Sequence, residues 1–151
     1  MIALTDAAAT ERAGAALAQL VRGGDAIALV GDLGTGKTTL VGALVAALGG
    51  GAATSPTFAL VNEYPTGRLV VVHVDLYRIE RERELIELGL DEPFDDRLLV
   101  VEWADRFDVM PVDHLRLELA HAGDQRTLVA TGTGPRGRAL ADGLARALGA
   151  S

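Results

Sequence analysis

The sequence contains no cysteine, and aromatic residues make up only 4% of it. A chain without thiols forms neither disulfides nor thiolate metal sites, and this fits a reducing compartment. A core with so few rings must be built from Val, Leu, Ile and Ala. No stretch approaches the roughly 18 apolar residues of a membrane span, and no basic region precedes an apolar run at the N-terminus. These absences predict a cytoplasmic protein with no membrane contact.

Positive charge is also scarce. Lys and Arg total 14 against 21 for Asp and Glu, which gives a net charge of −7. An acidic chain lacks the general attraction that nucleic-acid-binding proteins have for phosphate backbones, so we expect any RNA to be held by another subunit. Lys37 is the only lysine in the chain. A single lysine among many arginines indicates a position where Arg does not suffice.

The 151 residues, 49% of them hydrophobic and 23% charged, are expected to form one domain spanning 1–151. Thr5 or Asp6 is expected to cap a first helix that ends near Arg22. The apolar run 26–30 is typical of a strand buried on both faces, and a helix is predicted over 37–48. Further strands are predicted at 59–64, 69–76, 97–103, 115–119 and 127–130, and further helices at 80–88 and 138–148. This order predicts an α/β fold, a P-loop NTPase-like three-layer sandwich whose mixed sheet has a parallel centre and antiparallel additions.

The strongest functional signal is a phosphate-binding loop between the first strand and the second helix. Its glycines let several backbone N–H groups point into one concavity, and the helix N-terminus adds its dipole. Lys37 is expected to reach the β- and γ-phosphates of a nucleotide, and the Thr38 hydroxyl to bind Mg²⁺. The pattern G-x-x-x-x-G-K-[ST] is matched in full by Gly31, Asp32, Leu33, Gly34, Thr35, Gly36, Lys37 and Thr38, with Thr39 following.

Two acidic residues stand at the ends of apolar strands. Asp75 ends Leu69-Val70-Val71-Val72-His73-Val74-Asp75, and Glu102 ends Leu98-Leu99-Val100-Val101-Glu102. The carboxyl ends of parallel strands face the ligand crevice of an open α/β sheet, so both carboxylates are candidates for the metal side of a phosphoryl-transfer site. The alternative is that each is simply the first solvated residue after a strand.

Other polar residues near the loop allow more than one interpretation. The Asp32 side chain is expected either to face outward as a capping acceptor or to face the γ-phosphate. The connector with Thr54, Ser55 and Thr57 fits a switch loop that senses Mg²⁺ and γ-phosphate, but also a plain polar turn. Trp103, the only tryptophan, fits a core position better than a ligand contact. The three histidines lack metal-ligand spacing and are expected to be structural or surface residues: His73, His114 and His121.

The motifs G-D-L-G-T-G-K-T-T, T-S-P-T-F, N-E-Y, H-V-D-L-Y-R and V-E-W follow one another in this order. Their combination resembles the bacterial TsaE family (formerly YjeE), the ATPase of tRNA threonylcarbamoyladenosine biosynthesis. The segments T-E-R-A-G at 10–14 and E-L-I-E-L-G-L at 84–90 are similar to two further signatures of that family. The resemblance covers residues 10–126, most of the chain.

The resemblance implies ATP and Mg²⁺ as cofactors, with Thr38 and Glu102 holding the metal and Asp75 assisting the metal or the attacking water. It also implies that other residues lie at the nucleotide site: Thr10, Thr54 as part of a switch loop, Trp103 and Arg126. It further implies that the protein acts together with TsaB and TsaD, which transfer the threonylcarbamoyl group. The protein would then contact tRNA only indirectly, through that complex.

Two other functions remain open on the sequence. A P-loop small-molecule kinase would need an acceptor pocket and an arginine-bearing lid, for which Arg78, Arg81 and Arg83 are candidates. A binding module that senses ATP without hydrolysing it would not need both Asp75 and Glu102. A GTPase is disfavoured, because the chain has no N-K-x-D motif for reading guanine.

Overall fold

The computed structural model describes residues 1–32, 34–51, 61–77, 95–106 and 109–149. A seven-stranded sheet with the strand order β1-β7-β6-β2-β5-β4-β3 runs through it. The helices are α1 (Ala7–Leu20), α2 (Lys37–Ala47) and α4 (Gly134–Ala147), with a short 3-10 helix η1 (Ala104–Arg106). The strands are β1 (Ile2–Leu4), β2 (Ala26–Val30), β3 (Val61–Pro65), β4 (Val70–Asp75), β5 (Arg97–Glu102), β6 (His114–Ala122) and β7 (Gln125–Thr133).

The centre of the sheet is parallel and its edges are antiparallel. β2 pairs in parallel with both β5 and β6, and β4 pairs in parallel with β5. β3, β7 and β1 are added by antiparallel pairing. All five residues of β2 are buried, as expected for a strand that is covered on both faces. The predicted mixed sheet with a parallel centre is confirmed.

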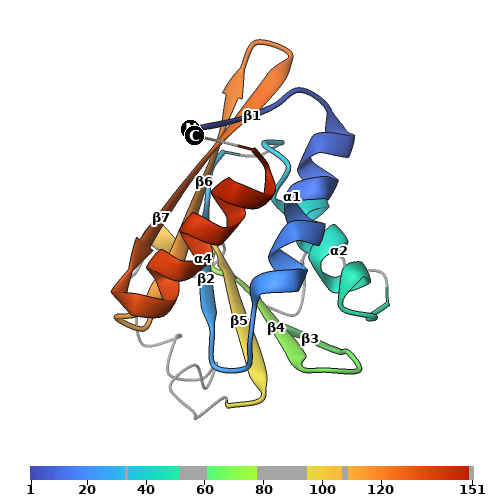
Figure 1. The fold of residues 1–151 in the computed structure, drawn as a ribbon, viewed down its shortest axis with the longest axis vertical. Coiled ribbons are helices and arrows are strands. Elements are labelled where there is room, and N and C mark those ends of the chain that lie inside the picture. Colours follow the sequence, from blue (N-terminus) through green and yellow to red (C-terminus); the bar gives the residue numbers. More distant parts are fainter. Residues whose placement is uncertain (33, 52–60, 78–94, 107–108, 150–151) are drawn as a thin grey trace.

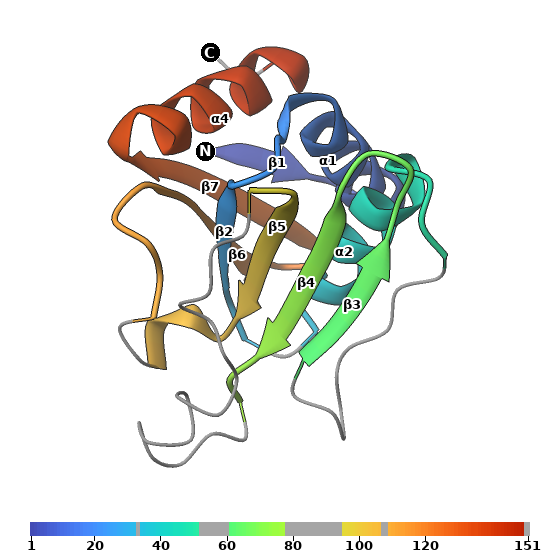
Figure 2. The same cartoon turned by 90° about the horizontal axis from the view of Figure 1, so that it is seen from below.

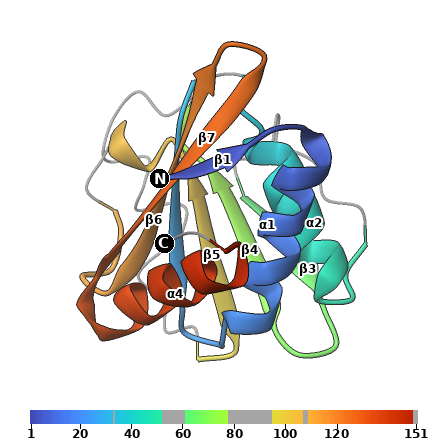
Figure 3. The same ribbon diagram turned by 45° about the horizontal axis from the view of Figure 1, so that its top comes forward.

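The fold has three layers. The helices α1, α2 and α4 lie on one face of the sheet (Figure 1), and Figure 3 shows all three in front of the strands. The main apolar core fills the space between them and includes Leu17, Leu44 and Leu144 from the three helices. A second apolar cluster covers the opposite face and includes Val74 of β4, Val101 of β5 and Ala104 of η1. β5, β4 and β3 are seen side by side in Figure 2.

α1 and α2 pack very closely at one glycine. A Cβ on Gly14 of α1 would lie 2.5 Å from the carbonyl oxygen of Leu40 and 2.8 Å from the Cβ of Ala43, both on α2. No larger side chain fits there without moving a helix. This contact sets the position of the N-terminal half of α1 against the helix that begins at Lys37.

Side chains fix both ends of α1. The predicted cap is Asp6, whose Oδ1 accepts a hydrogen bond from the backbone N–H of Ala9 at 2.8 Å. At the other end, the Arg68 guanidinium donates to the carbonyl oxygens of Ala18 and Val21 at 2.9 and 2.8 Å. Arg68 thereby satisfies two of the carbonyl groups that a helix leaves unpaired at its C-terminus.

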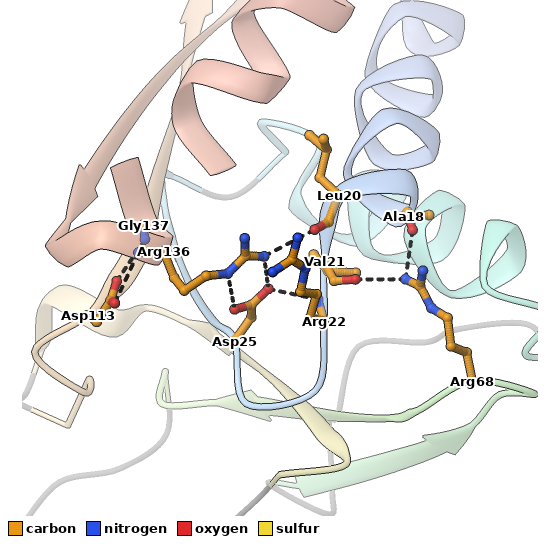
Figure 4. A network of polar contacts seen from close by, with 9 residues as sticks. All are labelled: Ala18, Leu20, Val21, Arg22, Asp25, Arg68, Asp113, Arg136 and Gly137. Carbon is orange, nitrogen blue, oxygen red and sulfur yellow. Dashed lines mark hydrogen bonds and ion pairs between the residues drawn. The ribbon is translucent and has the colours of Figure 1, made fainter. Parts of the chain in front are cut away.

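A second arginine connects α4 with the end of α1 and the start of β2 (Figure 4). Arg136 makes a two-pronged contact with the buried carboxylate of Asp25, through Nε at 3.0 Å and Nη2 at 2.7 Å. Its Nη2 also donates to the carbonyl of Leu20 at 3.1 Å. The first turn of α4 is capped by Asp113, which accepts hydrogen bonds from the backbone N–H groups of Arg136 and Gly137. These two bonds lower the pKa of Asp113.

Several element boundaries differ from the predictions. The three-residue strand β1 was not predicted, because it has no pattern of its own and exists through antiparallel pairing with β7. β6 and β7 are longer than predicted, and α4 begins at Gly134 instead of residue 138. β5 ends at Glu102, one residue early, because Trp103 has a φ of 59° and leaves the extended conformation. The helix predicted at 80–88 lies outside the described residues.

Candidate functional site

The loop after β2 has the backbone of a phosphate-binding loop. Three of its glycines have positive φ, namely Gly31 at 153°, Gly34 at 78° and Gly36 at 102°. Only glycine takes such conformations at little cost, and they turn successive N–H groups toward one concave side. The Thr35 hydroxyl donates to the carbonyl of Asp32 at 2.8 Å and closes the loop. α2 begins immediately afterwards at Lys37, so its N-terminus faces the same space.

Lys37 is held inside this loop. Its side chain is 5% exposed, and its ammonium donates to the carbonyl of Gly31 and, at 3.5 Å, to that of Asp32. The same nitrogen lies 3.9 Å from the centroid of the Trp103 ring, within the range of a cation–π contact. Burial lowers the pKa of Lys37, while the negative charges of Glu102 and Asp75 act in the opposite direction.

The two predicted carboxylates come together at the carboxyl ends of neighbouring strands. Asp75 of β4 and Glu102 of β5 are Cα partners in the parallel register, and Leu29 of β2 is the next partner of Glu102. Glu102 is buried at 3% exposure. Burial raises the pKa of Asp75, although its Oδ1 accepts a hydrogen bond from the backbone N–H of Tyr77 at 2.9 Å.

His73 is a member of this group that the sequence did not place there. It is fully buried, and its Nε2 lies 2.6 Å from Oε2 of Glu102. His73 and Asp75 are two residues apart on one strand and therefore point to the same face of the sheet. That spacing was visible in the sequence. The partner strand's register, which brings Glu102 alongside, was not.

Trp103 closes the site on one side. Its backbone N–H donates to the carbonyl of Leu29 at 3.1 Å, so Trp103 extends the pairing of β5 with β2 by one hydrogen bond. Its positive φ then turns the chain away from β2. Its ring packs against Tyr77 with the centroids 5.0 Å apart. Trp103 is partly buried: it packs against the second apolar cluster, as the predicted core position requires, and its ring also contacts Lys37.

A hollow of about 210 Å³ opens on the other side of the loop. Arg126 of β7 borders it and donates from Nε to the carbonyl of Gly34 at 3.2 Å. Thr10 is buried at the hollow, with its Cγ2 3.4 Å from where a Cβ on Gly36 would stand. The lining is completed by loop, strand and helix residues: Leu4, Asp6, Ala7, Thr35, Thr39 and Asp124. Thr10, Thr39 and Arg126, far apart in sequence, thus meet at the phosphate loop.

A second hollow of about 430 Å³ lies beside Trp103. Asp32 lines it and is exposed, so its carboxylate belongs to the Trp103 side of the loop and not to the side of Thr10. His121 lines the same hollow, whereas His114 lies elsewhere, with its Nδ1 2.7 Å from the carbonyl oxygen of Pro111. The predicted site residues Leu33 and Thr54 lie outside the described residues, as do Ser55, Thr57 and the arginines at 78, 81 and 83.

The donor groups suit a magnesium–nucleotide complex. Thr38 lies in the first turn of α2 beside Lys37, and the carboxylates of Glu102 and Asp75 face the charge of that lysine. Within the described ranges, no cluster of three or more His, Cys, Asp or Glu side chains could hold a metal by itself. Mg²⁺ is usually bound by one or two carboxylates together with substrate phosphates and water, so a small protein donor set beside a phosphate loop fits it.

The protein-family model described as "Threonylcarbamoyl adenosine biosynthesis protein TsaE" matches residues 4–128. The chain belongs to the TsaE family. The match extends slightly beyond the 10–126 over which the motifs resemble the family, and it includes the site residues described above, from Thr10 to Arg126. The role of the family in tRNA threonylcarbamoyladenosine biosynthesis therefore applies to this chain.

Individual relatives carry the same description. The chain is 38% identical over 133 residues to the "tRNA threonylcarbamoyladenosine biosynthesis protein TsaE" of Bacillus subtilis, covering 85% of this chain and 83% of that protein. It is 41% identical over 133 residues to the protein of that name from Streptomyces coelicolor, covering 82% and 90%. The crystal structure of Bacillus subtilis YdiB superposes with a TM-score of 0.75 at 29% identity, covering 95% of this chain and 92% of YdiB.

None of the helices in the described part of the chain is long and apolar enough to span a membrane.

Proposed function

We propose that this TsaE-family chain is a Mg²⁺-dependent ATPase with water as the phosphoryl acceptor. The observation that carries the proposal is the grouping of Lys37, Asp75 and Glu102. The lysine sits in the phosphate loop at the N-terminus of α2, and the two carboxylates stand at adjacent strand ends within range of its charge. A phosphate-binding cation opposed by two acids is the arrangement that phosphoryl transfer requires, since the protein has mainly to position and neutralise charge.

The residues divide the work by their chemistry. The loop N–H groups and Lys37 bind the β- and γ-phosphates, and the Thr38 hydroxyl and Glu102 carboxylate hold Mg²⁺. Mg²⁺ bound there would supply charge neutralisation for the phosphoryl transfer. Asp75 assists the metal or orients the attacking water, and burial raises its pKa, which makes the carboxylate a stronger proton acceptor than an exposed one.

The remaining parts of the site bind the rest of the nucleotide. Thr10, Thr39 and Arg126 line the hollow beside Gly34 and Gly36, which leads away from the phosphate loop. This hollow is the expected seat of the nucleoside, with Trp103 closing the opposite side. Leu33 contributes to the phosphate loop, and Thr54 belongs to the proposed switch loop.

The proposed partners are homologues of TsaB and TsaD, and this chain contacts tRNA only through the complex that it forms with them. The net charge of −7 supports this division of labour, because an acidic subunit has no general affinity for the RNA backbone. ATP hydrolysis by this chain would then reset the complex that performs the threonylcarbamoyl transfer.

The test is phosphate release from ATP, measured for the chain alone and with purified TsaB and TsaD homologues. We expect slow release alone, stimulation by the partners, and loss in Lys37→Ala and Glu102→Ala. Arg138→Ala, on the exposed side of α4, is a matched control that should behave as wild type. If the TsaB and TsaD homologues neither bind this chain nor change its rate of ATP hydrolysis, the proposed complex is wrong.

The same assay separates the ATPase from the two other functions. A small-molecule kinase would consume ATP only when a hydroxylated metabolite is added. A binding module would leave radiolabelled ATP intact after long incubation, with and without the partners. Either result would contradict the proposed hydrolysis.

A further inference from the structure

The buried contact between His73 and Glu102 is not explained by the family's phosphate loop. His73 has no exposed surface and Glu102 is 3% exposed, and their Nε2 and Oε2 atoms are 2.6 Å apart. This distance is in the short range of charge-assisted hydrogen bonds. A carboxylate only accepts, so the imidazole Nε2–H is the donor.

The rest of the imidazole makes no polar contact. Within the described part of the chain, Nδ1 is buried and has no hydrogen-bond partner. The ring lies beside Tyr64 of β3, with the centroids 6.5 Å apart and the planes tilted by 38°. A buried polar nitrogen without a partner costs free energy, so a purely structural position would be served better by an apolar side chain. The single polar group that the ring satisfies is the Glu102 carboxylate.

The contact also fixes the orientation of the Glu102 carboxylate. Oε2 accepts the hydrogen bond from His73, so the direction in which the carboxylate faces follows from the position of that ring. The two residues stand on adjacent parallel strands, where Val100, two residues before Glu102, is the Cα partner of His73. A glutamate has three rotatable side-chain bonds, and a hydrogen bond from a buried neighbouring strand removes most of that freedom.

We propose that His73 is a positioning residue that holds the Glu102 carboxylate in the orientation that binds the metal of the nucleotide complex. This inference rests on the proposed function, in which Glu102 is a Mg²⁺ ligand. His73 touches neither nucleotide nor metal and acts through Glu102. Partners of this kind behind metal ligands typically contribute a factor of about 10 to 100 in metal affinity.

The test compares His73→Gln with His73→Met. The two side chains have nearly the same length and shape, but only Gln carries an N–H₂ group that can replace Nε2–H. Mn²⁺ binding to the full chain saturated with ADP is followed by electron paramagnetic resonance, which needs no turnover. We expect the Mn²⁺ dissociation constant to rise about tenfold or more in His73→Met and to stay within about threefold of wild type in His73→Gln.

A double-mutant cycle with Glu102→Gln shows whether His73 acts through that residue. If it does, His73→Met weakens Mn²⁺ binding in the wild-type background and causes no further loss in the Glu102→Gln background. Equal losses in both backgrounds would show an independent effect on the fold and would overturn the proposal. ADP affinity in EDTA serves as the control, and we expect it to be unchanged by His73→Met.

The outcomes separate this inference from the proposed function. If Glu102→Gln weakens Mn²⁺ binding and His73→Met does not, the positioning role is wrong and the metal role of Glu102 stands. If Glu102→Gln itself has no effect, the proposed metal role fails. Each variant is first checked by thermal unfolding. Should His73→Met not fold, His73→Leu takes its place as the variant without a donor, and the same comparison with His73→Gln decides.

Discussion

The ammonium of Lys37 lies 3.9 Å from the centroid of the Trp103 ring, while its hydrogen bonds go to the loop carbonyls of Gly31 and Asp32. Lys37 therefore joins the phosphate loop to the ring of the only tryptophan in the chain. Phosphates bound by this lysine would place negative charge close to that ring.

Trp103 fluorescence should consequently report nucleotide binding. We expect the emission excited at long wavelength to change on addition of Mg-ATP, because the bound phosphates bring negative charge beside the Lys37–Trp103 contact. Lys37→Ala should lose this change and bind ATP at least about tenfold more weakly, which corresponds to the roughly 1.5–3 kcal/mol of a charge-assisted hydrogen bond. Equilibrium dialysis with labelled ATP measures the affinity independently. An unchanged emission at saturating ATP in the wild type would contradict the placement of the phosphates beside Trp103.

Asp75→Asn should make the protein more stable and less active. Burial raises the pKa of Asp75 above the ordinary value of 3.8, so the folded state binds this proton more tightly than the unfolded state does. The carboxylate therefore costs stability once the pH exceeds the raised pKa, and this cost disappears as the pH falls below about 3.8. Asparagine keeps an acceptor for the Tyr77 N–H.

We expect the melting temperature of Asp75→Asn to exceed that of wild type at pH 7.5, and the difference to shrink as the pH falls. Phosphate release should drop at the same time, since the variant can neither assist the metal nor take a proton. A melting-temperature difference that grows toward acid pH would show the opposite sign of the pKa shift.

Local patterns predicted the part of the site that is contiguous in sequence. The run 26–30, the glycine loop and the helix beginning at Lys37 are confirmed in position, because a buried strand, a turn and a helix each have a local pattern. Asp75 and Glu102 were predicted as candidates for one site because both end apolar strands, and the carboxyl ends of parallel strands face the ligand crevice. The register of β4 on β5 confirms that they are partners.

Contacts between distant residues could not be predicted in this way. Nothing in the sequence around residue 73 indicates that its ring meets Glu102, since that contact depends on the exact pairing of two strands separated by more than twenty residues. The position of Arg126 at the carbonyl of Gly34 depends likewise on the hairpin of β6 and β7. The strand β1 was missed because its stability comes from β7 and not from its own three residues.

Two glycines on the paired helices should respond in opposite directions to alanine. A Cβ on Gly14 would lie 2.5 Å from the backbone oxygen of Leu40, whereas a Cβ on Gly42 would meet nothing within 4 Å. We expect Gly14→Ala to lower the free energy of unfolding by about 1–3 kcal/mol through overpacking. Gly42→Ala should raise it by about 0.5–1 kcal/mol, because alanine is the better helix former.

Urea denaturation measures both values, and ATP affinity adds a functional reading. Gly14→Ala should also weaken ATP binding, since Thr10 and the phosphate loop are held together by the α1–α2 contact. If both substitutions change the free energy of unfolding by the same small amount, α1 and α2 can move apart at Gly14 without a loss of stability.

Arg136→Ala should destabilise the protein through a carboxylate that it leaves behind. Asp25 is 4% exposed and Arg136 is 33% exposed, and two hydrogen bonds of 3.0 and 2.7 Å join them. Breaking a fully buried pair costs about 3–5 kcal/mol, and the partial exposure of the arginine reduces our expectation to about 2–3 kcal/mol. Arg136→Lys should recover only part of the loss, because an ammonium cannot make the two-pronged contact.

Arg138→Ala is the matched control, since Arg138 is an exposed arginine two residues further along the same helix. Its effect on the free energy of unfolding should stay within about 0.5 kcal/mol. ATP affinity should remain at the wild-type value in both variants at temperatures where they are folded, because the Asp25 network lies away from the phosphate loop. The same urea midpoint for Arg136→Ala and Arg138→Ala would contradict this prediction. It would show that the backbone N–H of Arg22, which donates to Oδ2 at 2.8 Å, is enough to compensate the buried charge of Asp25.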